Sequence, residues 1–163
     1  MRGAQAGSAS ALEALYRAYW PRAYSAAYLV VHDAAAAEDI AQEAFLAAVR
    51  SLDSFDRSRP LGPWLHRIVV NRAIDWSRAR ALRAEIELVD APASDREPPG
   101  ELPMLVRALA CLPPEQRAVI VLRHLLEYTP GEIAELLDLP RGTVNSRLRR
   151  GLDELAAKLE AET

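Results

Sequence analysis

The sequence contains little cysteine and no long hydrophobic run, and each shortage excludes a class of protein. Its single cysteine, Cys111, excludes an internal disulfide framework and a zinc site built from cysteines, and we expect a small core residue there. No apolar run approaches the roughly 20 residues needed to span a bilayer, and the N-terminal MRGAQAGSAS lacks the apolar segment of a signal peptide. The sequence therefore predicts a soluble, cytoplasmic protein without membrane insertion.

Glycine and strand patterns are also scarce. Only 7 glycines occur among 163 residues, and no segment alternates apolar and polar residues as a half-buried strand would. Alanine, leucine and arginine dominate and favour helices, so the sequence predicts an all-α fold. Helices are expected near residues 11–31, 34–52, 64–83, 104–112, 115–125, 130–137 and 141–159. Pro21 should break or kink the first of them.

Charge divides the chain unevenly around its net value of −3. Residues 1–82 carry +2, residues 83–102 carry −4 and residues 103–163 carry −1. The middle segment, LVDAPASDREPPGELP, is rich in proline and acid and lacks periodic apolar positions, which is typical of a linker. The sequence predicts two small helical domains, residues 1–83 and 103–163, joined by a flexible acidic linker over residues 84–102.

The segment from Thr129 to Arg150 predicts a helix-turn-helix. Thr129 can cap a helix, Pro130 suits its first position, and Glu132 can close a capping box. Pro140 cannot continue that helix, and a second helix containing RGTVNSRLRR follows directly. Two short helices joined by so tight a turn describe the DNA-binding motif.

Helical phase separates an inner and an outer face on this second helix. At roughly 100° per residue, Val144, Leu148, Leu152 and Leu155 form the inner stripe. The outer face and its flanks carry Gly142, Thr143, Asn145, Ser146, Arg147, Arg149 and Arg150. Arginine can bind guanine through two hydrogen bonds, and asparagine can bind adenine in the same way. A solvated arginine face, balanced by the acidic residues of the next turn, is the alternative.

The segment LPPEQRAVIVLRHLLEYTPGEIAELLDLPRGTVNSRLRRGLDEL resembles the fourth conserved region of bacterial sigma factors, particularly the two-domain extracytoplasmic-function group. Response-regulator output domains share part of the pattern. Asp138 stands where glycine commonly makes the turn, and Pro140 where serine usually caps. The resemblance implies that double-stranded DNA of the promoter −35 element is bound by Arg141, Thr143, Asn145, Ser146, Arg147, Arg149 and Arg150.

The segment DAAAAEDIAQEAFLAAVRSLDSF resembles the helix with which this family binds the β′ clamp helices of core RNA polymerase. The resemblance implies a polymerase-binding role for Glu38, Asp39, Gln42 and Glu43. These side chains lie within about 140° of helical arc, and one turn later the same arc becomes apolar. An ordinary solvated stripe is the alternative interpretation.

The segment PLGPWLHRIVVNRAIDWSRARALR resembles the family's −10-reading and melting region. The resemblance implies that single-stranded −10 DNA is bound by Phe55, Trp64, Arg67, Asn71 and Arg78. Holding unstacked bases requires aromatic or amide pockets, with arginines along the phosphates. Leu61 replaces a common aromatic residue in the preceding loop, and core packing remains the alternative role for Trp64.

An enzyme is the contrasting class. The sequence lacks the metal-binding H-E-x-x-H pattern, a phosphate-binding glycine loop and a nucleophile elbow, and its three histidines lie in unrelated contexts. We therefore expect no catalytic activity, no metal and no cofactor. A one-component helix-turn-helix regulator is the closer alternative, but it would need no polymerase-binding helix. Many relatives are bound by an anti-sigma factor, so the resemblance makes such a protein a candidate partner.

Overall fold

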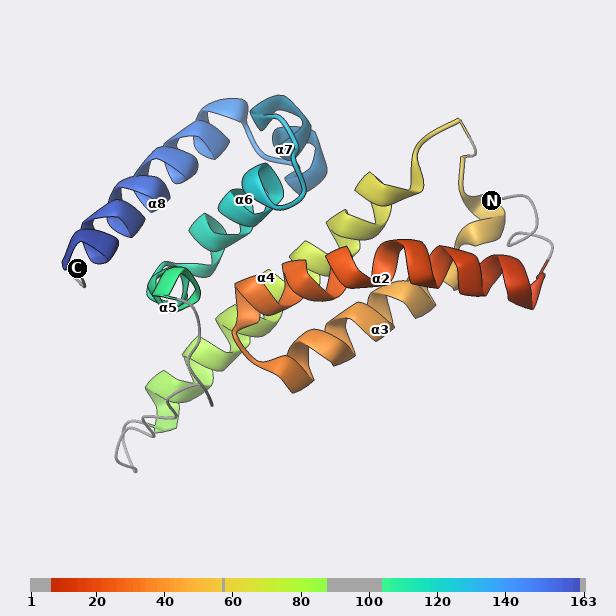
Figure 1. The fold of residues 1–163 in the computed structure, drawn as a ribbon, viewed down its shortest axis with the longest axis horizontal. Coiled ribbons are helices and arrows are strands. Elements are labelled where there is room, and N and C mark those ends of the chain that lie inside the picture. The colour runs from red at the N-terminus through yellow and green to blue at the C-terminus, as the bar shows by residue number, and fades with distance from the viewer. Residues whose placement is uncertain (1–6, 57, 88–103, 162–163) are drawn as a thin grey trace.

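The computed structural model describes residues 7–56, 58–87 and 104–161, and their regular structure is entirely helical (Figure 1). The elements in chain order are α2 (Ala9–Val31), α3 (Ala34–Arg50), the 3-10 helix η1 (Leu52–Ser54), α4 (Leu61–Glu87), α5 (Met104–Ala110), α6 (Pro114–His124), α7 (Pro130–Leu137) and α8 (Arg141–Ala161). The all-α prediction is therefore confirmed.

Helices α2, α3 and α4 pack together through small side chains. Ala23, Ala26 and Ala27 of α2 and Ala37 of α3 are fully buried, because alanine lets helix axes approach closely. Asp33 caps α3 by accepting a hydrogen bond from the Ala36 amide at 2.9 Å. These contacts hold the three helices as one bundle.

Two predicted features of this bundle need correction. Helix α2 continues through Pro21, so the break is absent, whereas the alternative of a kink stays a prediction. Helix α4 begins at Leu61 and ends at Glu87, which makes it longer at both ends than expected. Leu61 is buried and therefore contributes to the core. Residues 84–87 of the expected linker belong to α4, the rest of that linker lies outside the described residues, and the domain boundaries stay a prediction.

The helix-turn-helix is confirmed as α7 and α8. The Thr129 hydroxyl accepts from the Glu132 amide at 3.3 Å, and a Glu132 carboxylate oxygen accepts from the Thr129 amide at 2.7 Å, which completes the capping box. Asp138 ends α7 in the left-handed region with φ 54°. Aspartate tolerates that conformation better than most side chains, so it can make the turn without glycine.

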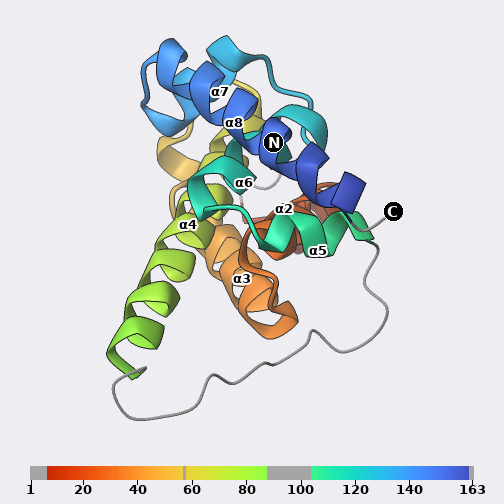
Figure 2. The same cartoon turned by 90° about the vertical axis from the view of Figure 1, so that its left-hand side faces the viewer.

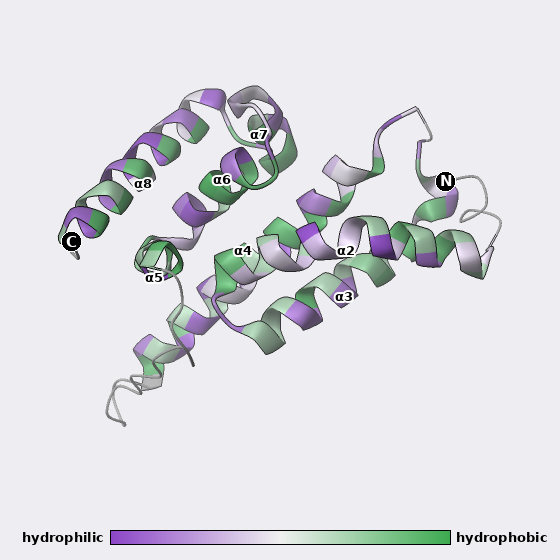
Figure 3. Ribbon diagram, viewed as in Figure 1, coloured by the Kyte–Doolittle hydropathy of each residue, from purple (hydrophilic) through white to green (hydrophobic). Residues whose placement is uncertain are grey.

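The inner face of α8 differs from the prediction at one position. Val144, Leu148 and Leu155 are buried as expected, whereas Leu152 is 39% exposed. Gly151 occupies the buried position instead, against Ile120 and Gln116 of α6. Figure 3 shows hydrophilic and hydrophobic bands alternating along α8, as expected for a helix with one buried and one exposed face. The inward stripe therefore centres on Gly151 rather than on Leu152.

The C-terminal helices pack directly against the N-terminal bundle. Helices α5 and α6 contact α2, and α6 and α7 contact α4, so buried residues form one continuous core (Figures 1 and 2). Cys111, in the turn between α5 and α6, is exposed. The expectation that it is a core residue is therefore wrong: helical packing buries its neighbours Ala108 and Leu112 instead.

Candidate nucleic-acid and polymerase interfaces

Helix α8 presents an uncompensated cationic ridge. Arg141, Arg149 and Arg150 are exposed, and none of the ion pairs found among the described residues involves them. Arg150 Nε donates to the Ser146 carbonyl at 3.3 Å, which directs its side chain along the helix. Positive groups that protein carboxylates do not neutralise remain available to phosphates and base edges.

The other predicted −35 residues surround this ridge. Asn145 is exposed, whereas Thr143, Ser146 and Arg147 are half-buried. The Ser146 hydroxyl donates to the Thr143 carbonyl at 3.0 Å. The seven residues therefore occupy one helix, with the charged side chains outermost.

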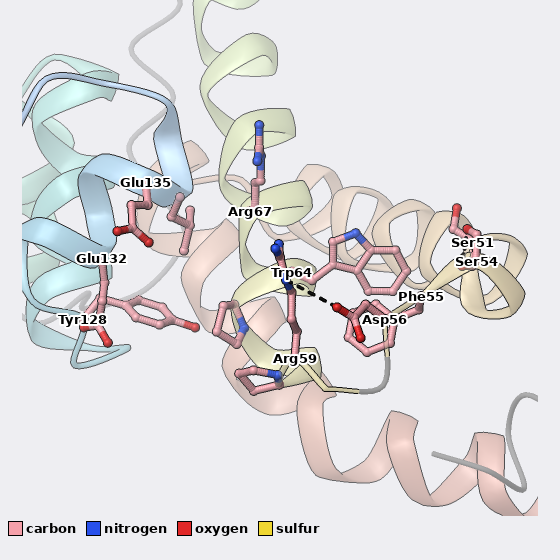
Figure 4. A pocket seen from close by; sticks show the side chains of 13 residues that line it. Ser51, Ser54, Phe55, Asp56, Arg59, Trp64, Arg67, Tyr128, Glu132 and Glu135 are labelled. Carbon is pink, nitrogen blue, oxygen red and sulfur yellow. Dashed lines mark hydrogen bonds and ion pairs between the residues drawn. The ribbon is translucent and has the colours of Figure 1, made fainter.

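A cleft of about 880 Å³ lies where the loop before α4 approaches α7 (Figure 4). Phe55 and Trp64 form one wall, with ring centroids 4.7 Å apart and planes inclined by 32°. Arg59 lies 3.7 Å from a carboxylate oxygen of Asp56, and Arg67 lines the same cleft. Aromatic faces beside guanidinium groups are the side chains that unstacked nucleotides require.

The structure brings together only part of the predicted −10 set. Phe55, Trp64 and Arg67 line the cleft, and Asn71 is half-buried one turn along α4. Arg78 lies roughly 16 Å from Arg67 along the helix axis, at 1.5 Å per residue. Its Nε donates to Glu115 of α6 at 2.6 Å, so this arginine is already paired.

The four predicted polymerase-binding residues are all exposed on α3. Gln42 donates to Glu38 at 3.3 Å, and Glu43 forms an ion pair with Arg72 of α4 at 2.5 Å. Leu46 and Val49 continue the same face and are 54% and 43% exposed. An acidic stripe that ends in exposed apolar side chains is typical of a protein-binding surface.

Comparison with known proteins decides the family. The family model described as Sigma-70 region 2 matches residues 15–83, and that described as Sigma-70, region 4 matches residues 102–155. The chain belongs to the ECF RNA polymerase sigma factors. It is 34% identical over 158 residues to SigW of Bacillus subtilis, covering 86% of this chain and 84% of that protein. It is 35% identical over 156 residues to SigM of Mycobacterium tuberculosis, covering 94% of this chain and 80% of that protein.

A solved structure supports the same assignment for this sigma factor. CnrH, determined in complex with the cytosolic domain of CnrY, matches with a TM-score of 0.74 and 29% identity over 99% of this chain and 96% of that one. The protein is therefore a sigma factor that directs promoter-specific transcription by RNA polymerase, and the one-component regulator is not favoured. The individual residue roles stay predictions.

The sequence did not reveal the side chains that join the two halves of the sigma factor. Tyr128 Oη lies 2.8 Å from His66 Nδ1, and Arg117 Nη1 lies 3.1 Å from His32 Nδ1. Partners separated by 62 and 85 positions leave no periodic signal in a single chain. Two local signals existed: His66 lies on the apolar side of α4, and Arg117 directly precedes the apolar run of residues 118–122 in α6.

Burial shifts the pKa of several of these groups. Desolvation, followed by the charge of Arg22, lowers the pKa of His66 to about 4. Desolvation, followed by the charge of Arg117, lowers the pKa of His32 to about 4 as well. Within the described residues no group of His, Cys, Asp or Glu side chains could hold a metal ion, and no helix is long and apolar enough to span a bilayer.

Proposed function

We propose that this sigma factor binds its ligands through three separate surfaces. Helix α3 binds core RNA polymerase, α8 enters the major groove of the −35 element, and α4 with the preceding loop holds single-stranded −10 DNA. The observation that carries the proposal is the uncompensated arginine ridge on the second helix of a confirmed helix-turn-helix.

The −10 role is supported by the Asn71 side chain and by two neighbouring aromatic rings. Within the described part of the chain, the Asn71 amide makes no hydrogen bond although it is half-buried. A partly buried amide without a partner is poised to bind a ligand's donor and acceptor groups. The Phe55 and Trp64 rings can supply a stacking surface beside it.

The proposal includes no bond chemistry, metal or cofactor for the chain itself, since its family consists of specificity factors for RNA polymerase. It places the protein in the cytoplasm, where polymerase acts. It also includes a partner protein, which we expect to be an anti-sigma factor, because CnrH, which has the same fold, was solved with the cytosolic domain of another protein, CnrY.

The test is reconstitution with core polymerase. The purified chain added to core enzyme should start transcription at defined genomic sites that core enzyme alone does not use. Start sites that share no upstream sequence, or a chain that fails to bind core enzyme, would contradict the proposal.

Arg149 offers a sharper test of the −35 surface. Arg149→Ala should weaken holoenzyme binding to a mapped promoter by about 1–3 kcal/mol, because a bidentate base contact is lost. The matched control is Lys158→Ala, which removes an exposed cation from the same helix beyond the recognition turns. If Arg149→Ala weakens every −35 sequence variant equally, Arg149 binds phosphate rather than a base.

A further inference from the structure

The cleft between α4 and α7 has two walls of different chemistry. Phe55, from the loop before α4, and Trp64 and Arg67 of α4 line one side, whereas Glu135 and Leu136 of α7 line the other. Figure 4 shows the Glu135 carboxylate across the cleft from the indole of Trp64. None of the three proposed surfaces uses the α7 wall, so the proposed function does not account for the carboxylate that faces this space.

Arg67 and Glu135 are the two charged side chains of the cleft that are available to a ligand. Neither forms a hydrogen bond or an ion pair with another described residue. The other charged side chains that line the cleft already have partners, namely Asp56, Arg59 and Glu132. A molecule that fills the cleft therefore meets one free guanidinium group and one free carboxylate.

The separation of these two groups determines the shape of a suitable ligand. Arg67 and Glu135 line the same cleft but form no ion pair with each other. A free amino acid carries its carboxylate and ammonium groups on one carbon atom, so it is too short to satisfy both. The volume of about 880 Å³ also lies in the upper part of the range of small-molecule sites, about 300–1,000 Å³. The ligand should therefore carry its anion and its hydrogen-bond donors at opposite ends.

The aromatic wall indicates what lies between those ends. The Phe55 and Trp64 rings are 4.7 Å apart, and Trp64 is half-buried. An aromatic ring of this kind favours a planar ring system stacked on its face, and every nucleobase has such a face. Arginine binds phosphate oxygens through charge-assisted hydrogen bonds. A planar base joined through a sugar to a phosphate matches both the rings and Arg67.

Glu135 determines which base fits. An ionised carboxylate only accepts hydrogen bonds, and its two oxygens can accept from two donors that lie side by side. Guanine has such a pair on one edge, the N1–H and the N2 amino group. Adenine has an acceptor nitrogen at N1, which a carboxylate repels. The unpaired Glu135 carboxylate therefore favours guanine over adenine.

We infer that this cleft binds a guanine mononucleotide, with the base against Trp64, the N1–H and N2 amino group donating to Glu135, and the phosphate at Arg67. The inference goes beyond the proposed function because it assigns a ligand to α7. The site shares Trp64 and Arg67 with the proposed −10 surface, whereas Glu135 belongs to none of the proposed DNA surfaces. Glu135 therefore distinguishes a nucleotide site from the −10 surface alone.

Isothermal titration calorimetry of the full-length chain with guanosine 5′-monophosphate (GMP) tests the site without DNA or polymerase. GMP should bind at least about tenfold more tightly than AMP, because adenine lacks the donor pair. Inosine 5′-monophosphate keeps the N1–H but lacks the 2-amino group, so its affinity should fall between the two. Guanosine lacks the phosphate and should bind about tenfold more weakly than GMP.

Two substitutions at exposed positions test the two ends of the ligand separately. Glu135→Gln should weaken GMP binding about tenfold without weakening AMP binding, because the carboxamide has only one accepting oxygen. Arg67→Ala should reduce the affinity for GMP to that for guanosine and leave guanosine binding unchanged. Glu154→Gln on α8 and Arg83→Ala on α4 make the same chemical changes at other exposed positions and should alter none of these affinities.

The outcomes separate this inference from the proposed function. A preference for GMP over AMP that persists at full size in Glu135→Gln would overturn the inference, because the base would then be selected elsewhere. Equal affinities for GMP and AMP, or no binding of either, would overturn it too, even if the chain directs core polymerase to defined start sites. A chain that binds GMP as expected but directs no such starts would contradict the proposed function alone.

Discussion

Gly151 is a residue at which α8 packs closely against α6. A Cβ atom added there would lie 2.9 Å from Ile120 Cδ1 and 3.3 Å from Gln116 Cβ. Ile120 and Gln116 are both buried, so neither side chain has free space into which it can move. The close approach explains why glycine stands inside a helix, where it normally costs about 1 kcal/mol relative to alanine.

Gly151→Val should therefore destabilise the chain by about 1–3 kcal/mol through overpacking, measured as a lower midpoint in urea denaturation. Gly142→Val is the matched control, because that glycine lies on the same helix with nothing within 4 Å of an added Cβ. The control should stay within about 0.5 kcal/mol of the parent chain. Equal effects at both positions would show that helix propensity, not packing, determines the result.

Substitution of Asn71 tests function without an expected change in folding stability. Its amide has no partner within the described residues, so Asn71→Ala removes no contact on which folding depends. We expect weaker open-complex formation, by about 1–3 kcal/mol if the amide binds a base, with unchanged binding to core polymerase. Glu85→Ala, an exposed substitution farther along α4, is the control. Loss of core binding by Asn71→Ala would contradict the assigned role.

Single residues also show where sequence reasoning succeeded and failed. The capping box of Thr129 and the inward direction of Val144 and Leu148 followed from local rules, and all are confirmed. The prediction that Leu152 is buried was wrong, because the buried stripe is centred on Gly151 and Leu152 lies at its edge. A glycine has no side chain to contribute to a hydrophobic pattern, so its burial is invisible to helical phase.

Helix α3 has an exposed stripe that begins with acidic and amide side chains and ends with the apolar Leu46 and Val49. Glu38 and Asp39 lie beyond the first turn, where the helix dipole has little effect, and neither forms an ion pair within the described residues. These two carboxylates therefore do not neutralise a cation within the described fold, in contrast to Glu43, which pairs with Arg72. The exposure of the stripe fits a surface that binds a partner.

Reversing both charges, Glu38→Lys with Asp39→Lys, should weaken core polymerase association at least tenfold, because like charges then meet across the interface. Co-purification with core enzyme and a titration by fluorescence anisotropy would measure the loss. Asp153→Lys with Glu154→Lys makes the same charge change at exposed positions of α8. If both double variants bind core enzyme equally well, the docking assignment for α3 fails.

At the level of helices, phase and capping located the elements, whereas packing set their lengths. Helix α2 passes through Pro21 because its buried residues on the C-terminal side of the proline, from Ala23 to Val31, hold that part against α3 and α4. Helix α4 starts at Leu61 because that side chain is buried. Tertiary burial overrides local propensity in both cases, and a single sequence does not display tertiary contacts.

At the scale of the whole molecule, the packing of the two halves against each other is the feature that the sequence did not predict. The contacts that join them pair residues as distant as His32 and Arg117, and phase on one helix cannot show that two such helices meet. The same contacts give the packing a defined dependence on pH. His32 and His66 both have a pKa of about 4, so both are neutral in the packed chain at pH 5.

Stability should therefore fall as the pH is lowered from about 6.5 towards 4. A histidine released into water titrates near its ordinary pKa of 6.5, so the open or unfolded chain binds more protons than the packed chain in this window. Above pH 6.5 both states are neutral and the stabilisation is complete. As the pH falls, each histidine should lower the free energy of unfolding by up to about 1.4 kcal/mol per pH unit. The pKa values of Glu115 and Glu132 lie below their usual range, so these carboxylates contribute little to the pH dependence of stability above pH 5.

Urea denaturation of the full chain at pH 7, 6 and 5 measures this slope. His66→Phe should flatten it by about half, because one of the two shifted groups is gone while Tyr128, Arg22 and the His32 contacts with Arg117 and Val106 remain. His124→Phe replaces an exposed histidine of α6 and should leave the slope unchanged. A slope that persists in His66→Phe at its full value would show that the buried imidazole of α4 does not control the packing of the two halves.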